Sequence, residues 1–209
     1  SLDFYVTQND LTGSSIINSV FCTQEKNSST NFNIFSLNGK LIRNNVLVEL
    51  LGGRSSSNVF GTSLLSNSEH LDNFITISHL VENCRSNQLF KSVYGGSSTG
   101  SFCGKIFVEK GAQQTEAFQQ NNNLMVSKKA SVNAKPQLEI FADDVVCSHG
   151  CTIGAIDEGG LFYLLSRGIP EEVAVSLLIS AFLNESISNI KNDDIKTRLA
   201  KLFLKDRHA

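Results

Sequence analysis

Short apolar runs separated by turn-forming residues fill the chain from Ser1 to about Ile156, and they constrain its fold more than any other feature. The runs include SSIINSVFC, NFNIFSL, NVLVELLGG, NFITISHLV, GKIFVEKG, NLMVSKKA and QLEIFADDVVCSHG. Runs of four to eight residues rich in Val, Ile, Phe and Thr indicate β-strands, and almost nothing here keeps a helical period. Residues 1–156 are therefore predicted to be all β, with Gly and Asn supplying left-handed backbone conformations at tight corners.

The turns between these runs favour a winding sheet over hairpins. The favoured hairpin pairs Asn-Gly and Asp-Gly occur only once, as Asn38-Gly39, which predicts an antiparallel hairpin joining NFNIFSL to KLIRNNVLVEL. Elsewhere, apolar runs centred near Phe90, Phe118 and Val145 lie about 27 to 28 residues apart, which suits one coil of a parallel β-helix. No repeated sequence word supports this period, so a β-sandwich is the alternative.

Helical signals replace the strand pattern from about Asp157. Gly168 ends a helix over LFYLLSR, and Pro170 begins the next one, because proline fits a first helical turn and the two glutamates after it favour the positive end of the helix dipole. This second helix is predicted to bury one broad apolar face, made of Val173, Ala174, Leu177, Leu178, Ala181 and Phe182.

A last helix is predicted to open at Asp193 or Asp194. Its inward residues are expected to be Ile195, Leu199, Leu202 and Phe203, and its outward residues Lys191, Lys196, Arg198 and Lys205. The chain thus divides into a β-solenoid over 1–156 and a small helical domain over 157–209. Such a domain can cover the open end of a solenoid, whose last coil otherwise leaves backbone N–H and C=O groups unpaired.

Composition narrows the class of protein. Eighteen basic and twenty acidic residues give a formal charge of -2, and without a long run of Lys or Arg no nucleic-acid partner is expected. No apolar run approaches a membrane span and the first ten residues are not a signal peptide, so we expect a soluble, non-exported protein. Five cysteines in a chain of 209 residues fit reduced thiols better than a disulfide framework.

One stretch, DDVVCSHGCTIG, carries a candidate for chemistry. In an extended strand Cys147, His149 and Cys151 project from one face, about 6 to 7 Å apart at each step. A structural zinc site needs a fourth ligand and paired spacing, so three interpretations stay open: a metal or cluster site, a Cys-His nucleophile, and buried cysteines beside a satisfied histidine. If it is a metal site it is incomplete, which suggests that a partner completes it.

Other candidates favour structural roles. GGSSTGSFCGKI fails as a phosphate loop, because Thr99 and Ile106 occupy positions that require Gly and Ser or Thr. Asp143 and Asp144 point to opposite strand faces, and Glu139 lies about 13 Å from Asp143, too far for the carboxylate pair of a polysaccharide hydrolase. The remaining cysteines Cys22, Cys84 and Cys103 are expected to fill the core, and His79 to be a packed histidine.

The blocks from HLVENCRSNQLF through ADDVVCSHG to LFYLLSRGIPEEVA closely resemble the C-terminal half of the SufB/SufD family of iron–sulfur cluster assembly proteins. The resemblance runs from about His79 to about Phe182 and is closer to SufD members than to SufB members. Over the first seventy residues it is limited to the general pattern of short strand-like runs. It implies a right-handed parallel β-helix followed by a C-terminal helical domain. Family members are generally longer at the N-terminus, so we expect a fragment that starts inside the β-helix.

The resemblance also implies a function: a non-enzymatic scaffold subunit that pairs with SufB through the β-helix end and binds the SufC ATPase through the helical domain. It places Cys147 and His149 near a SufB interface, where an iron–sulfur cluster is held transiently and not stably by this chain alone; Cys151, where the family usually has alanine, ranks lower. It places SufC contacts on the helix after Pro170 and at Leu161, Phe162, Tyr163, Leu164, Arg167, Gly168, Ile169 and Pro170.

In isolation the chain could pair with its own copy, and the expected compartment is a bacterial cytoplasm or a plastid stroma. The alternative from another class is a β-solenoid that binds carbohydrate or hydrolyses polysaccharide. Because the chain has no Trp and only three Tyr, it is poor in the aromatic side chains that such a site would need.

Overall fold

Strands occupy the first three quarters of the chain and helices the rest. The computed structural model describes residues 1–10, 13–188 and 190–205, and these form eleven strands and three helices. The strands are β1 (Leu2–Asn9), β2 (Ser15–Gln24), β3 (Ser29–Asn38), β4 (Leu41–Leu50), β5 (Ser56–Leu65), β6 (His70–His79), β7 (Arg85–Tyr94), β8 (Thr99–Val108), β9 (Thr115–Met125), β10 (Ser131–Ile140) and β11 (Val145–Ala155). The helices are α1 (Glu158–Ser166), α2 (Glu171–Ser188) and α3 (Asp193–Lys205).

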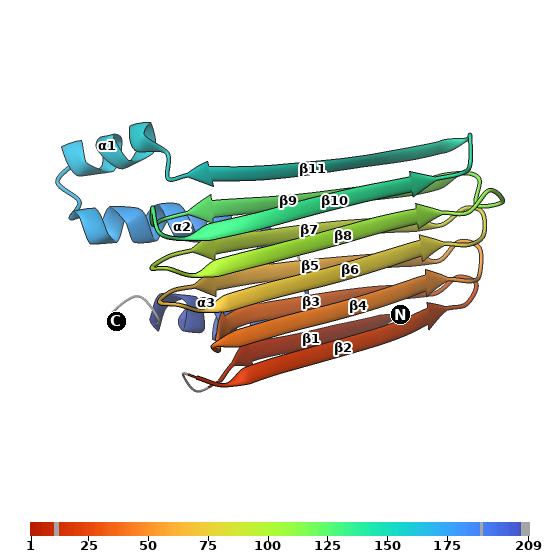
Figure 1. Cartoon of the computed structure of the whole chain (residues 1–209), viewed down its shortest axis with the longest axis horizontal. Helices are drawn as coiled ribbons and strands as arrows, with labels where there is room; N and C mark the ends of the chain where they lie inside the picture. The colour runs from red at the N-terminus through yellow and green to blue at the C-terminus, as the bar shows by residue number, and fades with distance from the viewer. Residues whose placement is uncertain (11–12, 189, 206–209) are drawn as a thin grey trace.

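The strands alternate between two parallel sheets that wind into a β-helix (Figure 1). The odd sheet has the order β1-β3-β5-β7-β9-β11, and the even sheet has the order β10-β8-β6-β4-β2. Every pairing within them is parallel, which confirms the predicted β-solenoid and excludes an antiparallel sandwich. The predicted hairpin at Asn38-Gly39 is wrong, because β3 and β4 lie in different sheets and this turn is a corner of the coil.

The coils are less regular than the predicted spacing of 27 to 28 residues. Ser15 pairs with Leu41, which gives a coil of 26 residues, whereas Thr99 pairs with Ser131, which gives one of 32. The apolar runs used to estimate the period are also out of register, since Phe118 lies opposite Ser148. Corners of different length therefore hide the repeat from the sequence.

Residues with a left-handed backbone form the corners, as predicted for Asn and Gly. Positive φ angles occur at Asn27, Asn67, Asn83 and Gly96. Arg54 takes the same conformation with φ 62 and donates its backbone N–H to the carbonyl of Asn83, 3.1 Å away on the next coil. Gly95–Ser98 form the corner between β7 and β8, so GGSSTGS is a turn and not a phosphate loop.

Alternate residues of both sheets point into the solenoid and make its core. The largest interior cluster contains Phe32, Ile34, Val46, Val48, Leu50, Val59, Ile75, Ile77, Cys84, Phe90 and Phe102. The interior is not wholly apolar: Asn44 donates to Asn73 at 2.9 Å, and Gln119 donates to Gln88 at 2.9 Å. Side-chain amides thus stack from coil to coil within the apolar core.

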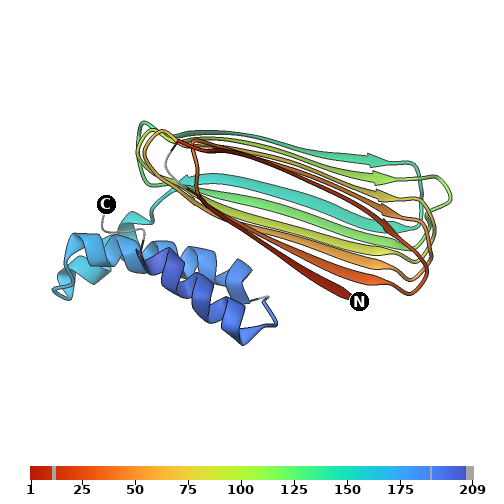
Figure 2. The same ribbon diagram turned by 90° about the horizontal axis from the view of Figure 1, so that it is seen from below.

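The helices cover the outer face of the odd sheet, as Figure 2 shows, and do not cap an end of the solenoid. The outer face carries Phe35, Leu37 and Val93, which form a second core with apolar residues of α2 and α3. The prediction of a helical end cap is therefore wrong: the apolar sheet face takes the helices, and the last coil stays open. No described helix is long and apolar enough to span a membrane.

The helix boundaries agree with the sequence, but one predicted face does not. Gly168 has φ +80 after α1, and the carbonyl of Pro170 accepts from the N–H of Ala174 in the first turn of α2. In α2, Ala174 is buried and Leu178 and Phe182 are half-buried, whereas the row Val173, Leu177 and Ala181 is exposed. The interpretation of both rows as one buried face is thus wrong.

The last helix begins at Asp193, and the side chain of Asn192 accepts from the N–H groups of Asp194 and Ile195. Its predicted inward residues Ile195, Leu199 and Leu202 pack against the second core. The side chains of Phe203 and Lys205 lie outside the described part of the structure.

Candidate functional site

Cys147, His149 and Cys151, called the candidate row from here on, lie on β11, the edge strand of the odd sheet at the open end of the solenoid. This strand pairs only with β9 among the described residues. It continues through Cys147, His149 and Cys151, which lie in register with Ala117, Gln119 and Asn121 of β9. These three residues of β9 are buried and face the interior. The candidate row therefore projects from the interior face of the last coil.

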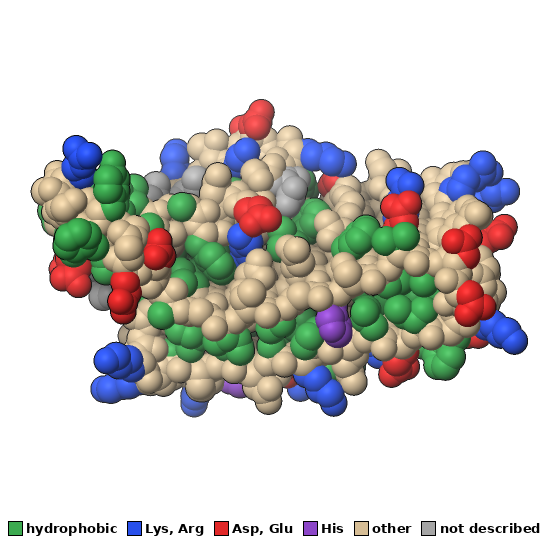
Figure 3. Space-filling model, turned by 90° about the horizontal axis from the view of Figure 1, so that it is seen from above, with side chains coloured by type: hydrophobic (Ala, Val, Ile, Leu, Met, Phe, Trp, Pro, Cys, Tyr) green, Lys and Arg blue, Asp and Glu red, His purple; other side chains and the backbone are tan. Residues whose placement is uncertain are grey.

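No further coil covers this end of the solenoid in the described structure. The even sheet ends at β10 and the odd sheet at β11, so each presents one free strand edge. His149 and Cys151 are exposed and Cys147 is half-buried. Figure 3 looks onto this end, where apolar side chains form a band interrupted by a histidine. Exposed apolar residues of β10, β11 and their connection are Ile140, Phe141, Val146 and Ile153.

The two thiols of the row have different surroundings. Cys147 packs against the end of the interior core, and this burial raises the pKa of its thiol, although a hydrogen bond with the backbone of Ala117 opposes the shift. The Sγ of Cys151 donates to the Oδ1 of Asn121 at 3.6 Å, and burial also raises the pKa of this thiol. Both thiols are therefore protonated near neutral pH and are weak ligands until a metal ion displaces the proton.

The row alone does not enclose a metal ion. Alternate residues of a strand are about 6 to 7 Å apart, and no group of three or more His, Cys, Asp or Glu in the described structure could hold a metal ion. Thiol and imidazole are nevertheless good donors for iron. The chain offers part of a ligand set along a strand edge, and a second surface facing it would have to supply the rest.

The other cysteines and histidines are mostly structural. His79 is fully buried, its Nε2 lies 2.8 Å from the Oγ of Ser86, and burial lowers its pKa to about 4, which confirms a packed histidine. Cys84 is buried and Cys22 packs against the core, as predicted. Cys103 is not a core residue: it alternates with buried neighbours and lies on the outer face of the even sheet. All five cysteines are free thiols.

The carboxylates near the row do not form a hydrolytic pair. Asp143 and Asp144 lie in an exposed bend between β10 and β11, and the backbone N–H of Asp144 donates to the side chain of Gln113. Glu139 points outward from β10 and pairs with Lys105 at 2.7 Å. The strand positions assumed for Asp143 and Asp144 are wrong, because the chain turns a corner between β10 and β11, but the expectation that these carboxylates are not a catalytic pair agrees with the structure.

The second predicted site, the partner-binding segment, lies on α1 and the turn after it. Phe162, Tyr163, Arg167, Gly168 and Pro170 are exposed, and Leu161, Leu164 and Ile169 are half-buried. The described α1 has no buried residue, and Phe162 is 73% exposed. Asp157 caps the N-terminus of α1 by accepting from the N–H groups of Gly159 and Gly160.

A neighbouring part of this surface lies on α2, the helix after Pro170, where two residues predicted to lie on a buried face are exposed. The exposed row of α2 includes Val173 and Leu177, and α1 packs against α2. We call these two residues with Phe162, Tyr163 and Leu165 the α1–α2 apolar surface. The signal for it was that α2 is apolar on more than one side, which a single buried face does not explain.

Residues 1–182 match the family described as SUF system FeS cluster assembly, SufBD core domain. The chain is 36% identical over 165 residues to the iron–sulfur cluster assembly protein SufD of Escherichia coli, covering 79% of this chain and 39% of that protein. It is 37% identical over 192 residues to the chloroplastic protein ABCI7 of Arabidopsis thaliana, covering 90% of this chain and 40% of that protein.

A SufBD family protein of Synechocystis is 35% identical over 164 residues, which cover 78% of this chain and 36% of the relative. In each of these three comparisons the aligned region spans two fifths or less of the relative's length.

Proposed function

Because the chain belongs to the SufBD family of the SUF iron–sulfur cluster assembly system, we propose that it is a scaffold subunit and not an enzyme. The observation that carries this proposal is the row of Cys147 and His149 on the free edge of the last coil. A scaffold needs donors that face a partner and release their cargo, and an incomplete ligand set on an exposed edge meets both needs.

The partner for this edge is proposed to be SufB, docked on the open end of the β-helix. Free strand edges are ready to pair with another chain, and apolar side chains such as Val146 and Ile153 are exposed beside them. Iron and sulfide are the substrates: Cys147 would lose its proton on binding iron, and His149 would offer a ring nitrogen. Cys151 is a secondary candidate donor. No cluster is expected to stay bound once the partner surface is removed.

The partner for the helical domain is proposed to be the SufC ATPase, docked on the α1–α2 apolar surface and the segment from Leu161 to Pro170. Large aromatic side chains that are exposed on a helix are typical anchors of a protein interface, and Phe162 and Tyr163 are the most exposed members of the surface. Nucleotide chemistry would then belong to SufC, since the glycine-rich stretch of this chain is only a corner.

The compartment is proposed to be a bacterial cytoplasm or a plastid stroma, since the relatives come from bacteria and a chloroplast. Without SufB, the same open end could pair with a second copy of this chain. A role in carbohydrate binding or hydrolysis gains no support from the positions of Asp143, Asp144 and Glu139.

The test of the interface site is co-expression with SufB and SufC, followed by measurement of complex composition and of bound iron and sulfide. His149→Ala is expected to lower bound iron and sulfide several-fold while the complex still forms. Ser148→Ala is the matched control, because this neighbour points to the opposite face of β11. Equal cluster content in both variants would remove His149 from the site.

The SufC contact is tested by the double variant F162S/Y163S, which is expected to weaken co-purification of SufC at least about tenfold, the usual effect of removing interface anchors. Phe74→Ser is the control, because Phe74 is an exposed phenylalanine of the even sheet, remote from α1. Unchanged recovery of SufC with the double variant would contradict the proposed contact.

A further inference from the structure

A pair of buried glutamines lies directly beneath the candidate row. Gln88 of β7 and Gln119 of β9 are in register and almost fully buried. The Nε2 of Gln119 donates to the Oε1 of Gln88 at 2.9 Å. The next position of this ladder, on the open coil, is His149, which is in register with Gln119. The ladder therefore runs from the interior of the solenoid to the candidate donor.

The side-chain oxygen of Gln119, the glutamine nearer the open end, is an unused hydrogen-bond acceptor in the described structure. The Oε1 of Gln119 is buried and has no hydrogen-bond partner in the described structure. An unsatisfied buried carbonyl is costly, and an apolar residue would avoid the cost. The acceptor lies one position below the imidazole of His149, which points to that ring as the donor.

The opposite sheet leaves space for this amide. Gly104 of β8 faces the interior, and a Cβ there would lie 2.2 Å from the Nε2 of Gln119. A side chain at position 104 would force the Gln119 amide and the Phe102 ring, 2.7 Å from the same Cβ, to shift. The absence of a side chain on one sheet therefore allows the glutamine of the other sheet to reach its place.

The neighbouring positions lack such an acceptor. Cys147 lies above Ala117, which has no polar side-chain atom. Cys151 lies above Asn121, whose Oδ1 already accepts from the Sγ of Cys151 and from the Nδ2 of Asn123 at 2.7 Å. Of the three side chains beneath the candidate row, only that of Gln119 has a free acceptor. It lies under His149, the one residue of the row with a ring N–H to donate.

We propose that Gln119 is a positioning residue for His149, and that its Oε1 accepts a hydrogen bond from one ring N–H of the imidazole. A histidine that donates one ring N–H in this way is held in one tautomer, and its other nitrogen is left as a lone-pair donor. That nitrogen would then face outward from the open end. The link to iron rests on the proposed function, whereas the hydrogen bond itself does not.

The experiment is to measure the tautomers of His149 by long-range ¹H–¹⁵N NMR of the ¹⁵N-labelled full chain at about pH 8.5, where histidines are neutral. The wild type is expected to show one tautomer in an excess of about three- to tenfold, the range that one hydrogen bond gives. In Gln119→Leu the ratio should move to that of a histidine of the unfolded chain. Gln119→Glu keeps an acceptor oxygen and should restore a dominant tautomer.

The matched control is Gln120→Leu, because the next residue of β9 points to the outer face and should leave the ratio unchanged. A wild-type His149 with no dominant tautomer, or a ratio that Gln119→Leu does not alter, would overturn the proposal. The wild-type measurement decides the question even if Gln119→Leu does not fold.

A second arm separates this proposal from the proposed function. In the complex co-expressed with SufB and SufC, Gln119→Leu should lower bound iron and sulfide several-fold without changing subunit composition. If the tautomer shifts but neither Gln119→Leu nor His149→Ala changes cluster content, the positioning role stands and the proposed cluster site fails.

Discussion

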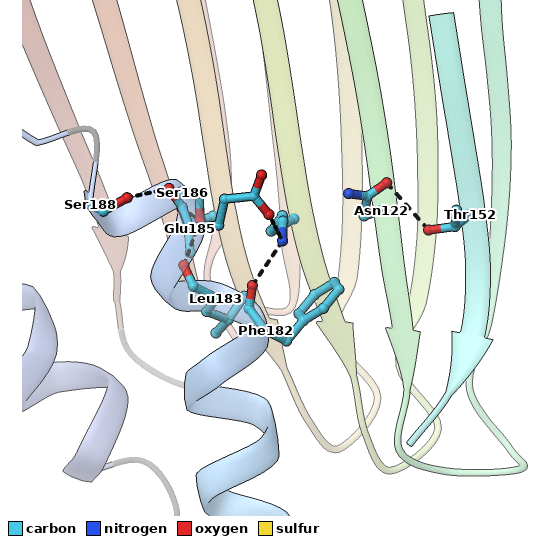
Figure 4. Close-up of polar contacts among 9 residues, drawn as sticks. Asn122, Thr152, Phe182, Leu183, Glu185, Ser186 and Ser188 are labelled. Atoms are coloured by element: carbon cyan, nitrogen blue, oxygen red, sulfur yellow. Dashed lines mark hydrogen bonds and ion pairs between the residues drawn. The ribbon is translucent and has the colours of Figure 1, made fainter. Parts of the chain in front are cut away.

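Lys91 of β7 pairs its ammonium with the carboxylate of Glu185 on α2, the helix that packs on this strand. Figure 4 labels Glu185 and its helix neighbour Phe182. The same Nζ donates to the carbonyl of Phe182 at 3.1 Å and lies 4.8 Å from the centroid of that ring. The side chain of Lys91 is buried, with 8% of its surface exposed, whereas that of Glu185 is 59% exposed. The charged side chain of Lys91 therefore holds one turn of α2 against the odd sheet. The edge strand β11 of this sheet lies two strands from β7.

Replacing Lys91 with methionine should loosen α2 while leaving the β-helix intact. Methionine keeps most of the apolar stem but loses the contacts with Glu185 and with the Phe182 carbonyl. Because Glu185 is exposed and screened by water, we expect a loss of about 1 kcal/mol in the free energy of unfolding. Amide hydrogen exchange in α2 should rise several-fold, and exchange in β6 and β8 should not change.

The matched control is Lys105→Met, which removes a more exposed lysine from its pair with Glu139. Its effect should stay within about 0.5 kcal/mol, as for other surface pairs. Equal effects of the two substitutions, or faster exchange throughout the sheets, would contradict the anchoring role of Lys91.

Local sequence favoured a solenoid over a sandwich but did not give its dimensions. Short apolar runs indicated strands, and the scarcity of hairpin turns favoured winding, because both are properties of neighbouring residues; the family resemblance then implied the β-helix. The coil length depends on corners that differ by several residues, and the one favoured hairpin pair, Asn38-Gly39, closes a corner. Cys103 was misplaced for the same reason: which face of a strand points inward is set by the whole coil.

The candidate row was predicted because its spacing lies within one strand, whereas its support was not. Gln119 is thirty residues from His149 and becomes its neighbour only through the register of β9 and β11. The packing of the helices on the odd sheet could not be predicted either. The helix α2 is apolar on two sides, and the sequence does not say which side contacts the sheet. Long-range register and the choice between two apolar faces are thus what the structure adds.

Gly61 is expected to tolerate no side chain. A Cβ at this position of β5 would lie 2.2 and 2.3 Å from two ring atoms of the buried Phe90. Gly61→Ala should therefore lower the free energy of unfolding by about 1 to 3 kcal/mol, the range for overpacking a core, measurable by chemical denaturation. Gly150→Ala is the control, because nothing lies within 4 Å of a Cβ there; a loss equal to that of Gly61→Ala would refute the steric explanation.

The stability of the fold should fall in mild acid because of His79. Burial lowers the pKa of this histidine from 6.5 to about 4, so the unfolded chain binds a proton more readily than the folded one. The stabilisation is complete above pH 6.5 and is lost as the pH falls from about 6.5 through 4, with a total of about 3 kcal/mol. Denaturation curves at a series of pH values measure this loss.

His79→Gln, which does not titrate, should flatten that part of the pH profile. His70→Gln serves as the comparison, since His70 is half-buried with its Nδ1 2.6 Å from the Oγ1 of Thr99 and its replacement leaves His79 in place. A profile for His79→Gln as steep as that of the wild type would show that another group causes the acid sensitivity.

Cys147 should react slowly with alkylating reagents until the pH is well above neutral. Burial raises the pKa of its thiol above the ordinary value of 9.0, and only the thiolate is a nucleophile. Peptide-level mass spectrometry after brief iodoacetamide treatment should therefore give a midpoint for Cys147 at higher pH in the folded chain than in the same chain unfolded by urea. The unfolded chain is the matched control, because it presents the identical peptide without burial. A folded midpoint at or below the unfolded one would contradict the effect of burial on this thiol, and a midpoint near neutral pH would mean that Cys147 does not need a bound metal ion to lose its proton.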